Sequence, residues 1–371
     1  MTSLRVRIAG GSVGGLFAAA LLRRDGHDVR LYERSSGGLA GRGAGLVGQR
    51  DLFALLREVG CEHVADVGVV AWERIFLDRA GTIGHLQRTP QTQISWDHLF
   101  RTMRSKVEDG DYVPGRAVRA VEQDADGARL LFEDGGSEEA DLVIGADGLG
   151  SVVRGAVAGD GSRNVYAGYV AWRGLIPERE VPPEAAVLMN RFAFYEMPRS
   201  HALGYLVAGP GGETEAGSRR YNWVWYRPVG EADLPATLTA ADGRRHPFSL
   251  APGQVPPEAA ALLRADAAAL LPTPFAAVVA AEPRPFVQAI FDYEPPVMAS
   301  GRVALLGDAA FVVRPHTAMG VAKAAGDALA LRRALARHGG VAEALRAYDE
   351  ERHPANAAIA AYGRRLGATL G

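Results

Sequence analysis

The hydrophobic pattern of the first 34 residues predicts a strand, a helix and a second strand. Leu4, Val6 and Ile8 alternate with polar residues, as in a short strand. A stretch rich in alanine and leucine then continues to about Arg24 and stops near Gly26, which predicts a helix. Residues 28–33 form a second alternating run. This order of elements is typical of an α/β fold built on a parallel sheet.

The pattern in the rest of the chain predicts a second kind of sheet. Apolar runs at 140–146 and 302–306 predict two further buried strands. Between residues 166 and 226 the apolar positions alternate with period two, which predicts a mixed or antiparallel sheet. Alanine-rich helices are expected at 256–271, after Gly320, and at 341–366, the last broken at Pro354. We therefore expect a discontinuous first domain (1–75, 96–165 and 285–371) and an inserted second domain (76–95 and 166–284).

Composition excludes several classes of protein. The chain has 371 residues, enough for about two domains, and a formal net charge of −2, which does not favour a nucleic acid or a membrane surface as partner. Its single cysteine, Cys61, excludes an intramolecular disulfide, an iron–sulfur cluster and a cysteine-based zinc site, and no metal site is predicted. No apolar stretch is long enough for a membrane helix. We expect a cytoplasmic location.

The glycine-rich turn after the first strand has the context of a dinucleotide-binding motif. It reads Gly-Gly-Ser-Val-Gly-Gly over residues 10–15. Gly10 permits the tight turn, Gly15 lets helix and strand approach, and the helix N-terminus offers free N–H groups to a pyrophosphate. Glu33 ends the second strand, where a carboxylate can accept hydrogen bonds from ribose hydroxyls. Ser12 stands where a second glycine is usual; its hydroxyl either donates to a phosphate or is merely tolerated as a small group.

A second match to the same glycine pattern, Gly43–Gly48, follows no predicted strand. We interpret it as a loop, because the pattern without its strand and helix is weak evidence.

Two further turns follow predicted buried strands. The first contains Asp147 and Gly148, with Ser151 and Arg154 shortly after, and the second contains Gly307 and Asp308. The second continues through residues 314–320 into a long helix. Taken singly, each turn is equally well explained as purely structural. Together they lie where parallel strands deliver ligand contacts, at their carboxyl ends.

In this order and spacing, the three motifs resemble the fingerprints of the class A flavoprotein monooxygenases, the aromatic hydroxylases. The resemblance spans the chain and is greatest to the branch that contains 2,6-dihydroxypyridine 3-hydroxylase. It rests also on four segments, Tyr169–Gly174, Tyr221–Pro228, Pro285–Ile290 and Gly307–His316. One familiar residue differs: Trp96 replaces an arginine that is often found at the start of a helix there.

The resemblance implies a Rossmann-like domain that binds FAD non-covalently and meets NAD(P)H only transiently. The backbone from Ala318 to Gly320 would face the flavin pyrimidine ring, where a helix dipole stabilises the negative charge of reduced flavin. The residues that it implies for cofactor binding are Gly10, Ser12, Val13, Gly14, Gly15, Glu33, Arg34, Gln49, Asp147, Gly148, Arg154, Gly307, Asp308, Ala318, Met319 and Gly320.

The predicted second sheet is unusually aromatic, with 11 of the chain's 28 aromatic residues between Tyr166 and Tyr226. Such a sheet either lines a pocket for a flat ring or forms an ordinary aromatic core; beside a flavin domain we favour the pocket. Asn222 is a further polar candidate for orienting the substrate. The residues predicted to contact substrate are Trp172, Asn190, Tyr195, His201, Tyr205, Trp223 and Trp225.

Three residues are candidates for catalysis. His316 lies in the loop predicted to open onto the flavin, where its imidazole either accepts a phenolic proton or serves as a structural hydrogen-bonding group. Pro315 would lie near the reactive edge of the flavin. Arg173 follows Trp172 on a predicted strand and pairs either with a substrate oxyanion or with a carboxylate of the protein.

The resemblance implies a monooxygenase that uses NAD(P)H and O₂ to hydroxylate a small hydroxylated aromatic or N-heteroaromatic ring through a flavin C4a-hydroperoxide. Alternatives are a tailoring oxygenase (hydroxylation or epoxidation) of a larger natural product and a non-catalytic flavoprotein that sequesters a ligand. Flavin-dependent halogenases need a lysine early in the chain. The first lysine here is Lys106, on a predicted helix, which disfavours a halogenase. A homodimer is the default expectation.

Overall fold

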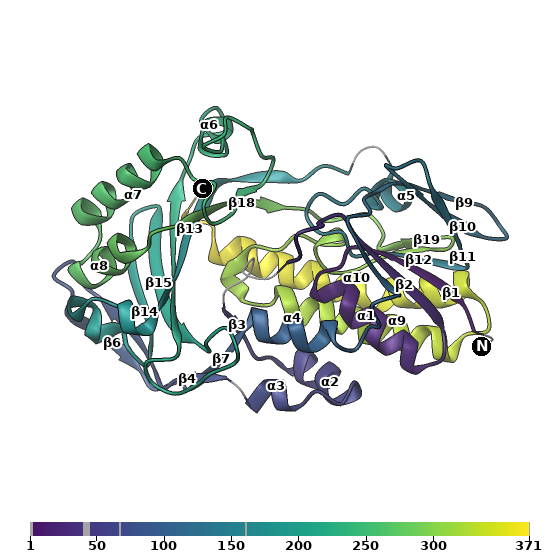
Figure 1. The fold of residues 1–371 in the computed structure, drawn as a ribbon, viewed down its shortest axis with the longest axis horizontal. Helices are drawn as coiled ribbons and strands as arrows, with labels where there is room; N and C mark the ends of the chain where they lie inside the picture. The colour runs from purple at the N-terminus through teal and green to yellow at the C-terminus, as the bar shows by residue number, and fades with distance from the viewer. Residues whose placement is uncertain (1–2, 40–44, 67, 160–161, 371) are drawn as a thin grey trace.

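The computed structural model describes residues 3–39, 45–66, 68–159 and 162–370 and shows two lobes side by side (Figure 1). One lobe is built on a six-stranded sheet of order β19-β20-β12-β1-β2-β8, in which only β19 is antiparallel to its neighbour. The strands are β1 (Arg5–Ala9), β2 (Asp28–Glu33), β8 (Tyr112–Pro114), β12 (Leu142–Gly145), β19 (Ala299–Ser300) and β20 (Val303–Leu305). The predicted α/β class and the four predicted strands of this sheet are confirmed.

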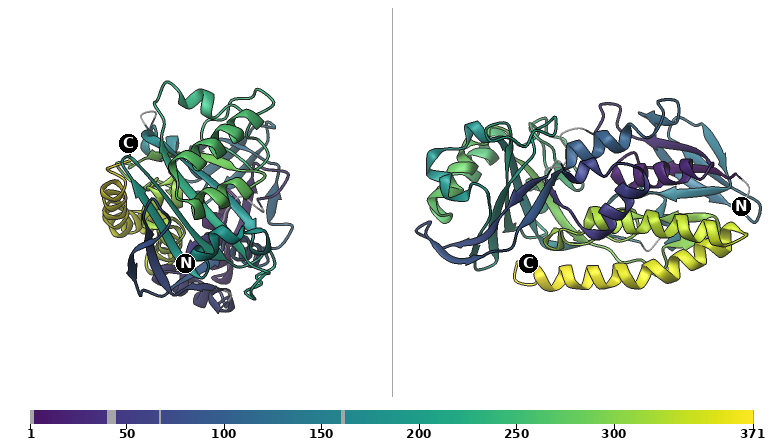
Figure 2. Two further views of the ribbon diagram at one scale, coloured as in Figure 1. Left: turned by 90° about the vertical axis from the view of Figure 1, so that its left-hand side faces the viewer. Right: turned by 90° about the horizontal axis from the view of Figure 1, so that it is seen from below.

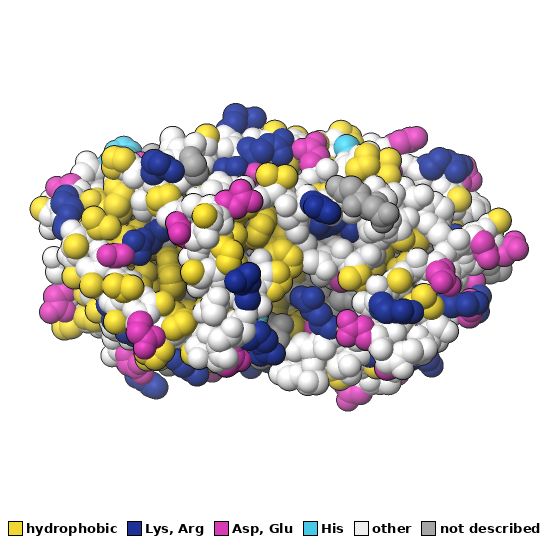
Figure 3. Space-filling model, turned by 90° about the horizontal axis from the view of Figure 1, so that it is seen from above, with side chains coloured by type: hydrophobic (Ala, Val, Ile, Leu, Met, Phe, Trp, Pro, Cys, Tyr) yellow, Lys and Arg dark blue, Asp and Glu magenta, His cyan; other side chains and the backbone are white. Residues whose placement is uncertain are grey.

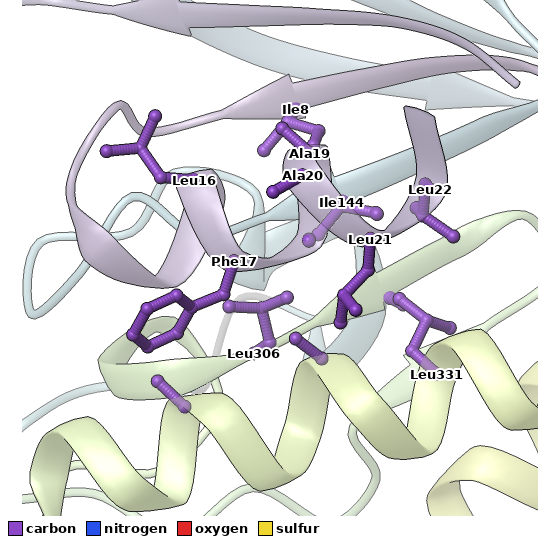
Figure 4. Close-up of a cluster of buried hydrophobic side chains, with 14 of the residues drawn as sticks. Ile8, Leu16, Phe17, Ala19, Ala20, Leu21, Leu22, Ile144, Leu306 and Leu331 are labelled. Atoms are coloured by element: carbon purple, nitrogen blue, oxygen red, sulfur yellow. The ribbon is translucent and has the colours of Figure 1, made fainter. Parts of the chain in front are cut away.

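Helix α1 (Val13–Arg24) packs between this sheet and helix α9 (Gly320–Arg337). Its alanines and leucines are buried on nearly every side, so the helix is apolar throughout and not a one-sided stripe. Figure 4 shows Phe17 and Leu21 of α1 on the side of the helix that faces Leu306 and Leu331, whereas Leu16 points to the other side. The other helices of this lobe are α2 (Arg50–Glu58), α3 (His63–Asp66), α4 (Trp96–Arg104), α5 (Arg154–Ala158) and α10 (Val341–Leu366).

Helix α10 is continuous through Pro354, so the predicted break there is wrong. Proline removes one N–H donor and usually kinks a helix. Here Arg352 and Asn356, on either side of the proline, both donate to Asp327 of α9, at 2.8 and 2.9 Å. The two halves are therefore fastened to one neighbouring helix. The right view of Figure 2 shows α10 running along the edge of the molecule.

The second lobe holds an eight-stranded mixed sheet of order β17-β18-β13-β16-β15-β14-β5-β6. Only the β14–β5 pair is parallel. Helices α7 (Pro257–Leu270) and α8 (Thr273–Ala281) pack on one face, and α6 (Leu234–Thr237) lies nearby (Figure 1). The strands are β5 (Glu73–Leu77), β6 (Ile83–Gln87), β13 (Val165–Pro177), β14 (Arg191–Met197), β15 (Ser200–Val207), β16 (Arg220–Pro228), β17 (Ser249–Leu250) and β18 (Phe286–Asp292).

Two three-stranded sheets complete the fold. One has the order β3-β7-β4, with β3 (Gly45–Val47), β4 (Val69–Ala71) and β7 (Gln91–Ser95), and the other is the meander β9 (Val118–Gln123), β10 (Ala128–Phe132) and β11 (Ser137–Ala140). Of the second glycine motif, Gly43 and Ala44 lie outside the described residues, whereas residues 45–47 form β3 and not the expected loop. Strand β18 pairs with β13 in the eight-stranded sheet, although the predicted boundaries assign 285–371 to the other domain.

Candidate active site

The parallel strands β1, β2, β12 and β20 end at one edge of the six-stranded sheet and bring the predicted cofactor motifs together. Gly10 follows β1 with a φ of +107°, a conformation that favours glycine, and a Cβ there would lie 2.2 Å from the Ala146 carbonyl oxygen. A Cβ on Gly15 would lie 2.0 Å from the Gly10 carbonyl oxygen. The turn therefore allows a close approach of α1 that no larger residue permits.

The N-terminus of α1 is open to a ligand. Ser12 is its N-cap residue, yet the Ser12 side chain makes no capping hydrogen bond. The Glu33 carboxylate lies beside the turn and accepts from the backbone N–H of Gly11 and of Ser35, each at 2.8 Å. A carboxylate has further acceptor capacity for ribose hydroxyls. Arg34 is exposed at the next position.

Arg154 and Asp147 brace the neighbouring turns. The Arg154 guanidinium is buried and donates to the carbonyl oxygens of Ala309 (2.9 Å) and Asp308 (2.8 Å) and to Asn164 (2.9 Å). Asp147 accepts from Ser151 and from backbone N–H groups in its own loop. Arg154 thus positions the Asp308 turn, and its direct contact with the cofactor stays a prediction.

A buried ion cluster holds the Gly307 turn (η3, Gly307–Ala309). The Lys323 ammonium donates to the Gly307 carbonyl oxygen at 2.6 Å, and Asp327 accepts from the Gly307 N–H at 3.0 Å. Asp327 also forms an ion pair with Arg352 at 2.8 Å. Lys323 and Asp327 are at most 1% exposed. Both backbone groups of Gly307 are therefore held by charged side chains, with the Asp308 carboxylate, 54% exposed, on the outer side of the turn.

A cavity of about 740 Å³ extends from this turn to the face of the eight-stranded sheet opposite α7 and α8. Asp308, Pro315, His316, Ala318 and Gly320 line its cofactor end. Ala318 has a φ of +53° just before α9 begins, and its carbonyl oxygen accepts from the Gln49 amide at 3.0 Å. Gln49 therefore positions the loop and also lines the cavity.

The alternation along each strand decides which predicted substrate residues reach the cavity. Arg173 and Tyr205 line it, whereas four predicted residues point to the opposite face and pack in the core beneath α7 and α8. Those four are Trp172, Tyr195, Trp223 and Trp225. The prediction that they line the pocket is wrong, because the helices cover the face with the larger aromatic side chains.

Two other candidates also lie apart from the lining. Asn190 is exposed, in a left-handed conformation, and accepts from Arg219 at 3.0 Å. Asn222 is on the cavity side of the sheet but fully buried, and its amide has no hydrogen-bond partner among the described residues.

His316 belongs to a cluster of rings at the cofactor end of the cavity. Its Nε2 lies 2.7 Å from the hydroxyl of Tyr169, and its ring centroid lies 4.5 Å from that of Tyr226 and 5.4 Å from that of His201. Burial lowers the pKa of His316 to about 3 and that of His201 to about 4. Both imidazoles are therefore neutral near pH 7, and His316 is a much weaker base than its unperturbed pKa suggested.

Arg173 places an unpaired positive charge in the cavity. Its guanidinium carbon lies 5.7 Å from the Phe286 ring centroid, and its Nε is buried without a hydrogen-bond partner among the described residues. No carboxylate of the described residues forms an ion pair with it. A charged donor in this position is suited to an anionic ligand.

Comparison with known proteins agrees with this geometry. The model of the FAD binding domain family matches residues 3–228 and 293–362, and an FAD binding domain-like model matches residues 166–292. The chain belongs to the FAD-binding-domain family. FAD is accordingly its cofactor: the glycine cradle, the open α1 N-terminus, Glu33 and the outward carboxylate of Asp308 suit its ADP and ribityl groups.

Several relatives of this FAD-dependent chain are named monooxygenases. It is 34% identical to 2,6-dihydroxypyridine 3-monooxygenase of Paenarthrobacter nicotinovorans over 89% of this chain and 82% of that protein. It is 33% identical to 3-amino-4-hydroxybenzoate 2-monooxygenase of Streptomyces cremeus, over 98% and 86%. The solved structure of 2,6-dihydroxypyridine-3-hydroxylase from Arthrobacter nicotinovorans superposes with a TM-score of 0.92 at 31% identity, covering 100% and 93%. The chain is therefore an FAD-dependent aromatic monooxygenase of the class A family.

Among the described residues no helix is long and apolar enough to cross a membrane. Trp96, which replaces the familiar arginine, is the first residue of α4 and stacks on Phe100 with ring centroids 5.1 Å apart.

Sequence reasoning missed several residues of the monooxygenase site. Tyr169 and Tyr226 lie on the same strand faces as Arg173 and His201, so the alternation carried a signal for them. Lys323 and Asp327 are spaced by four in an alanine-rich helix, which is typical of one helix face. The sequence offered no sign that this face is buried.

The two half-buried histidines predict an acid-sensitive fold for the monooxygenase. Unfolding returns each imidazole to a pKa near 6.5, so below that pH the unfolded chain binds protons that the folded chain does not. The contribution of the two neutral histidines to the free energy of unfolding is complete above pH 6.5 and decreases as the pH falls toward 4. We expect a loss of about 1 kcal/mol per histidine at pH 5, since partial exposure reduces the effect. Urea unfolding at pH 7 and pH 5 should show it, and a doubly substituted H201Q/H316N protein should lose less; equal losses would contradict it.

Proposed function

We propose that the chain uses NAD(P)H and O₂ to hydroxylate a small aromatic or N-heteroaromatic ring that bears a hydroxyl group and binds as an anion. The observation that carries this is Arg173, a guanidinium in the cavity without a carboxylate partner among the described residues. The names of the relatives agree, because dihydroxypyridine and aminohydroxybenzoate are both acidic hydroxylated rings. Bound FAD would supply an electrophilic oxygen atom from O₂ at the expense of NAD(P)H.

In this proposal the protein's own groups bind and orient the ring. Val224, Leu203 and Ile290 line the sheet side of the cavity and exclude water. His316 is neutral and its Nε2 is taken by Tyr169, which leaves Nδ1 for the ring hydroxyl. Arg173 stabilises the negative charge on the substrate, and so favours the deprotonated ring, which is the better nucleophile.

The first experiment is NAD(P)H consumption by the purified yellow protein in air. 2,6-Dihydroxypyridine, 3-amino-4-hydroxybenzoate and unsubstituted pyridine are compared, with NADH and NADPH in parallel. The proposal expects strong stimulation by a hydroxylated ring, none by pyridine, and a product heavier by one oxygen atom. Stimulation by none of the three in a protein that retains its flavin would contradict the small-ring proposal and favour a larger substrate.

Replacing Arg173 should weaken substrate binding selectively. Arg173→Met removes the guanidinium at that point of the cavity, and we expect KM for the anionic ring to rise about 10- to 100-fold, because a charge-assisted hydrogen bond is lost. Arg173→Lys keeps the charge but lacks the planar guanidinium, so its KM should lie between those of the wild type and Arg173→Met. Steady-state kinetics at saturating O₂ measure the effect. An unchanged KM in Arg173→Met would show that Arg173 does not touch the substrate.

A further inference from the structure

We propose a second anion-binding subsite at the outer end of the cavity, formed by Arg74, Gln91 and Phe192, which takes a carboxylate on a substrate longer than one ring. The proposal rests on the proposed function and extends it, since the hydroxylated ring assigned there would be the reacting end of a longer substrate in the same cavity. A cavity of about 740 Å³ reaches from Gly320 at the cofactor end to Thr89 and Pro90, which are exposed. One small ring bound at His316 therefore leaves this outer end free for a further part of a longer ligand.

The arginines of the eight-stranded sheet divide into two groups. Three form ion pairs with carboxylates: Arg191 with Glu73 (3.1 Å), Arg220 with Asp97 (2.9 Å) and Arg227 with Asp266 (2.6 Å). The other two, Arg74 and Arg173, have no carboxylate partner among the described residues. They are also the two that line the cavity.

Arg74 is held in place without being neutralised. Its guanidinium carbon lies 5.8 Å from the Phe192 ring centroid, and it donates to the neutral Gln91 side-chain oxygen at 2.5 Å. Its Nε is buried and has no hydrogen-bond partner among the described residues. A buried donor without a partner costs free energy, and a carboxylate of the ligand would recover it through a charge-assisted hydrogen bond. The side chain is thus preorganised for an anion.

The surroundings of Arg74 suit a second flat group. Phe192, Phe194 and Phe76 are half-buried and in contact, with centroid distances of 4.6 Å (Phe192–Phe194) and 5.1 Å (Phe194–Phe76), and Tyr205 meets Phe192 edge-on at 4.8 Å. This row continues across the sheet toward the strands that carry Tyr226 and Arg173. Figure 3 shows hydrophobic side chains gathered over this lobe.

The separation of Arg74 from the His316 cluster sets the length of the ligand. Strand β5, which carries Arg74, is three strands away from β16, which carries Tyr226 at the His316 cluster. At about 4.8 Å per strand this is roughly 14 Å across the sheet. A single ring cannot contact both ends, whereas two linked rings with a terminal carboxylate reach toward Arg74. Arg173 would hold the reacting ring and Arg74 the distal acid.

Equilibrium binding tests the subsite without turnover. The probes are 4′-hydroxybiphenyl-4-carboxylate, its carboxamide and 2,6-dihydroxypyridine, titrated into the FAD-loaded protein in the absence of NAD(P)H and followed by the flavin absorbance. In the wild type we expect the carboxylate to bind at least 10-fold more tightly than the carboxamide. Arg74→Gln should abolish this preference and leave the Kd of dihydroxypyridine within about twofold.

Arg191→Gln is the matched control, because Arg191 lies on the adjacent strand and does not line the cavity. It should retain the preference for the carboxylate. The subsite is refuted if the wild type shows no preference, if Arg74→Gln retains it, or if Arg74→Gln weakens dihydroxypyridine equally. If the protein binds the carboxylate through Arg74 but no added ligand stimulates its oxidation of NAD(P)H, the proposed function is refuted and the subsite stands.

Discussion

Gly15→Ala is expected to yield a protein without FAD and less stable by about 3 kcal/mol or more. The added Cβ would lie 2.0 Å from the Gly10 carbonyl oxygen, which is backbone and cannot rotate away. Relief requires α1 to move off the end of β1, and that movement opens the turn that meets the pyrophosphate. The flavin-to-protein absorbance ratio after purification and the urea midpoint of the apoprotein measure the two effects.

Two alanine substitutions serve as controls for the Gly15 prediction. A Cβ on Gly14, the preceding residue of the same helix, would lie 3.1 Å from a terminal methyl carbon of Leu306, a flexible side chain that can shift. Gly155 is in α5, and a Cβ there meets nothing within 4 Å. Gly14→Ala should therefore retain FAD, and Gly155→Ala should be neutral or slightly stabilising. Retention of FAD by Gly15→Ala would show that FAD binding does not depend on the close approach of α1 to the Gly10 turn.

Much of the cofactor half is predictable because its signals are local. The glycine turn needs a positive φ at Gly10 and space at Gly15, and both demands are visible in six consecutive residues. The strands that carry the turns are buried on both faces and read as continuous apolar runs. The edge of a parallel sheet then brings together turns far apart in sequence, such as those at Gly10 and Asp308.

The substrate half was less predictable because a strand has two faces. The alternation separates Trp172 from Arg173, but it does not reveal which face the helices cover. That choice depends on α7 and α8, some 90 residues later in the chain, packing on the Trp172 side. Favouring large aromatic side chains for the pocket therefore selected the core. The cavity instead carries smaller or polar groups on the same strands, such as Ala171, Arg173 and Val224.

Asp327→Asn is expected to cost about 3–5 kcal/mol of unfolding free energy, although it preserves the shape of the side chain. Asp327 is fully buried and accepts from the Gly307 N–H, from Arg352 and from Asn356. With the carboxylate gone, Arg352 loses its buried ion-pair partner, and Lys323 keeps only the half-exposed Asp308 carboxylate at 3.8 Å. Removal of one partner from a buried pair is strongly destabilising. The amide that replaces the carboxylate also turns N–H hydrogens toward neighbours that are themselves hydrogen-bond donors. Urea unfolding with matched FAD concentrations measures the loss.

The matched comparison is Asp266→Asn, the same chemical change at an ion pair with Arg227 where the acid is 42% exposed. An exposed pair contributes about 1 kcal/mol or less, so this variant should unfold close to the wild type. The Asp327 variant should also lose FAD affinity, because Gly307 precedes Asp308 in the turn that the cluster holds. Titration of the apoprotein with FAD in the absence of urea measures the FAD affinity separately from the loss of stability. Equal stability of the two variants would mean that water or a compensating shift neutralises the cluster, and that the Gly307 turn is held by its backbone alone.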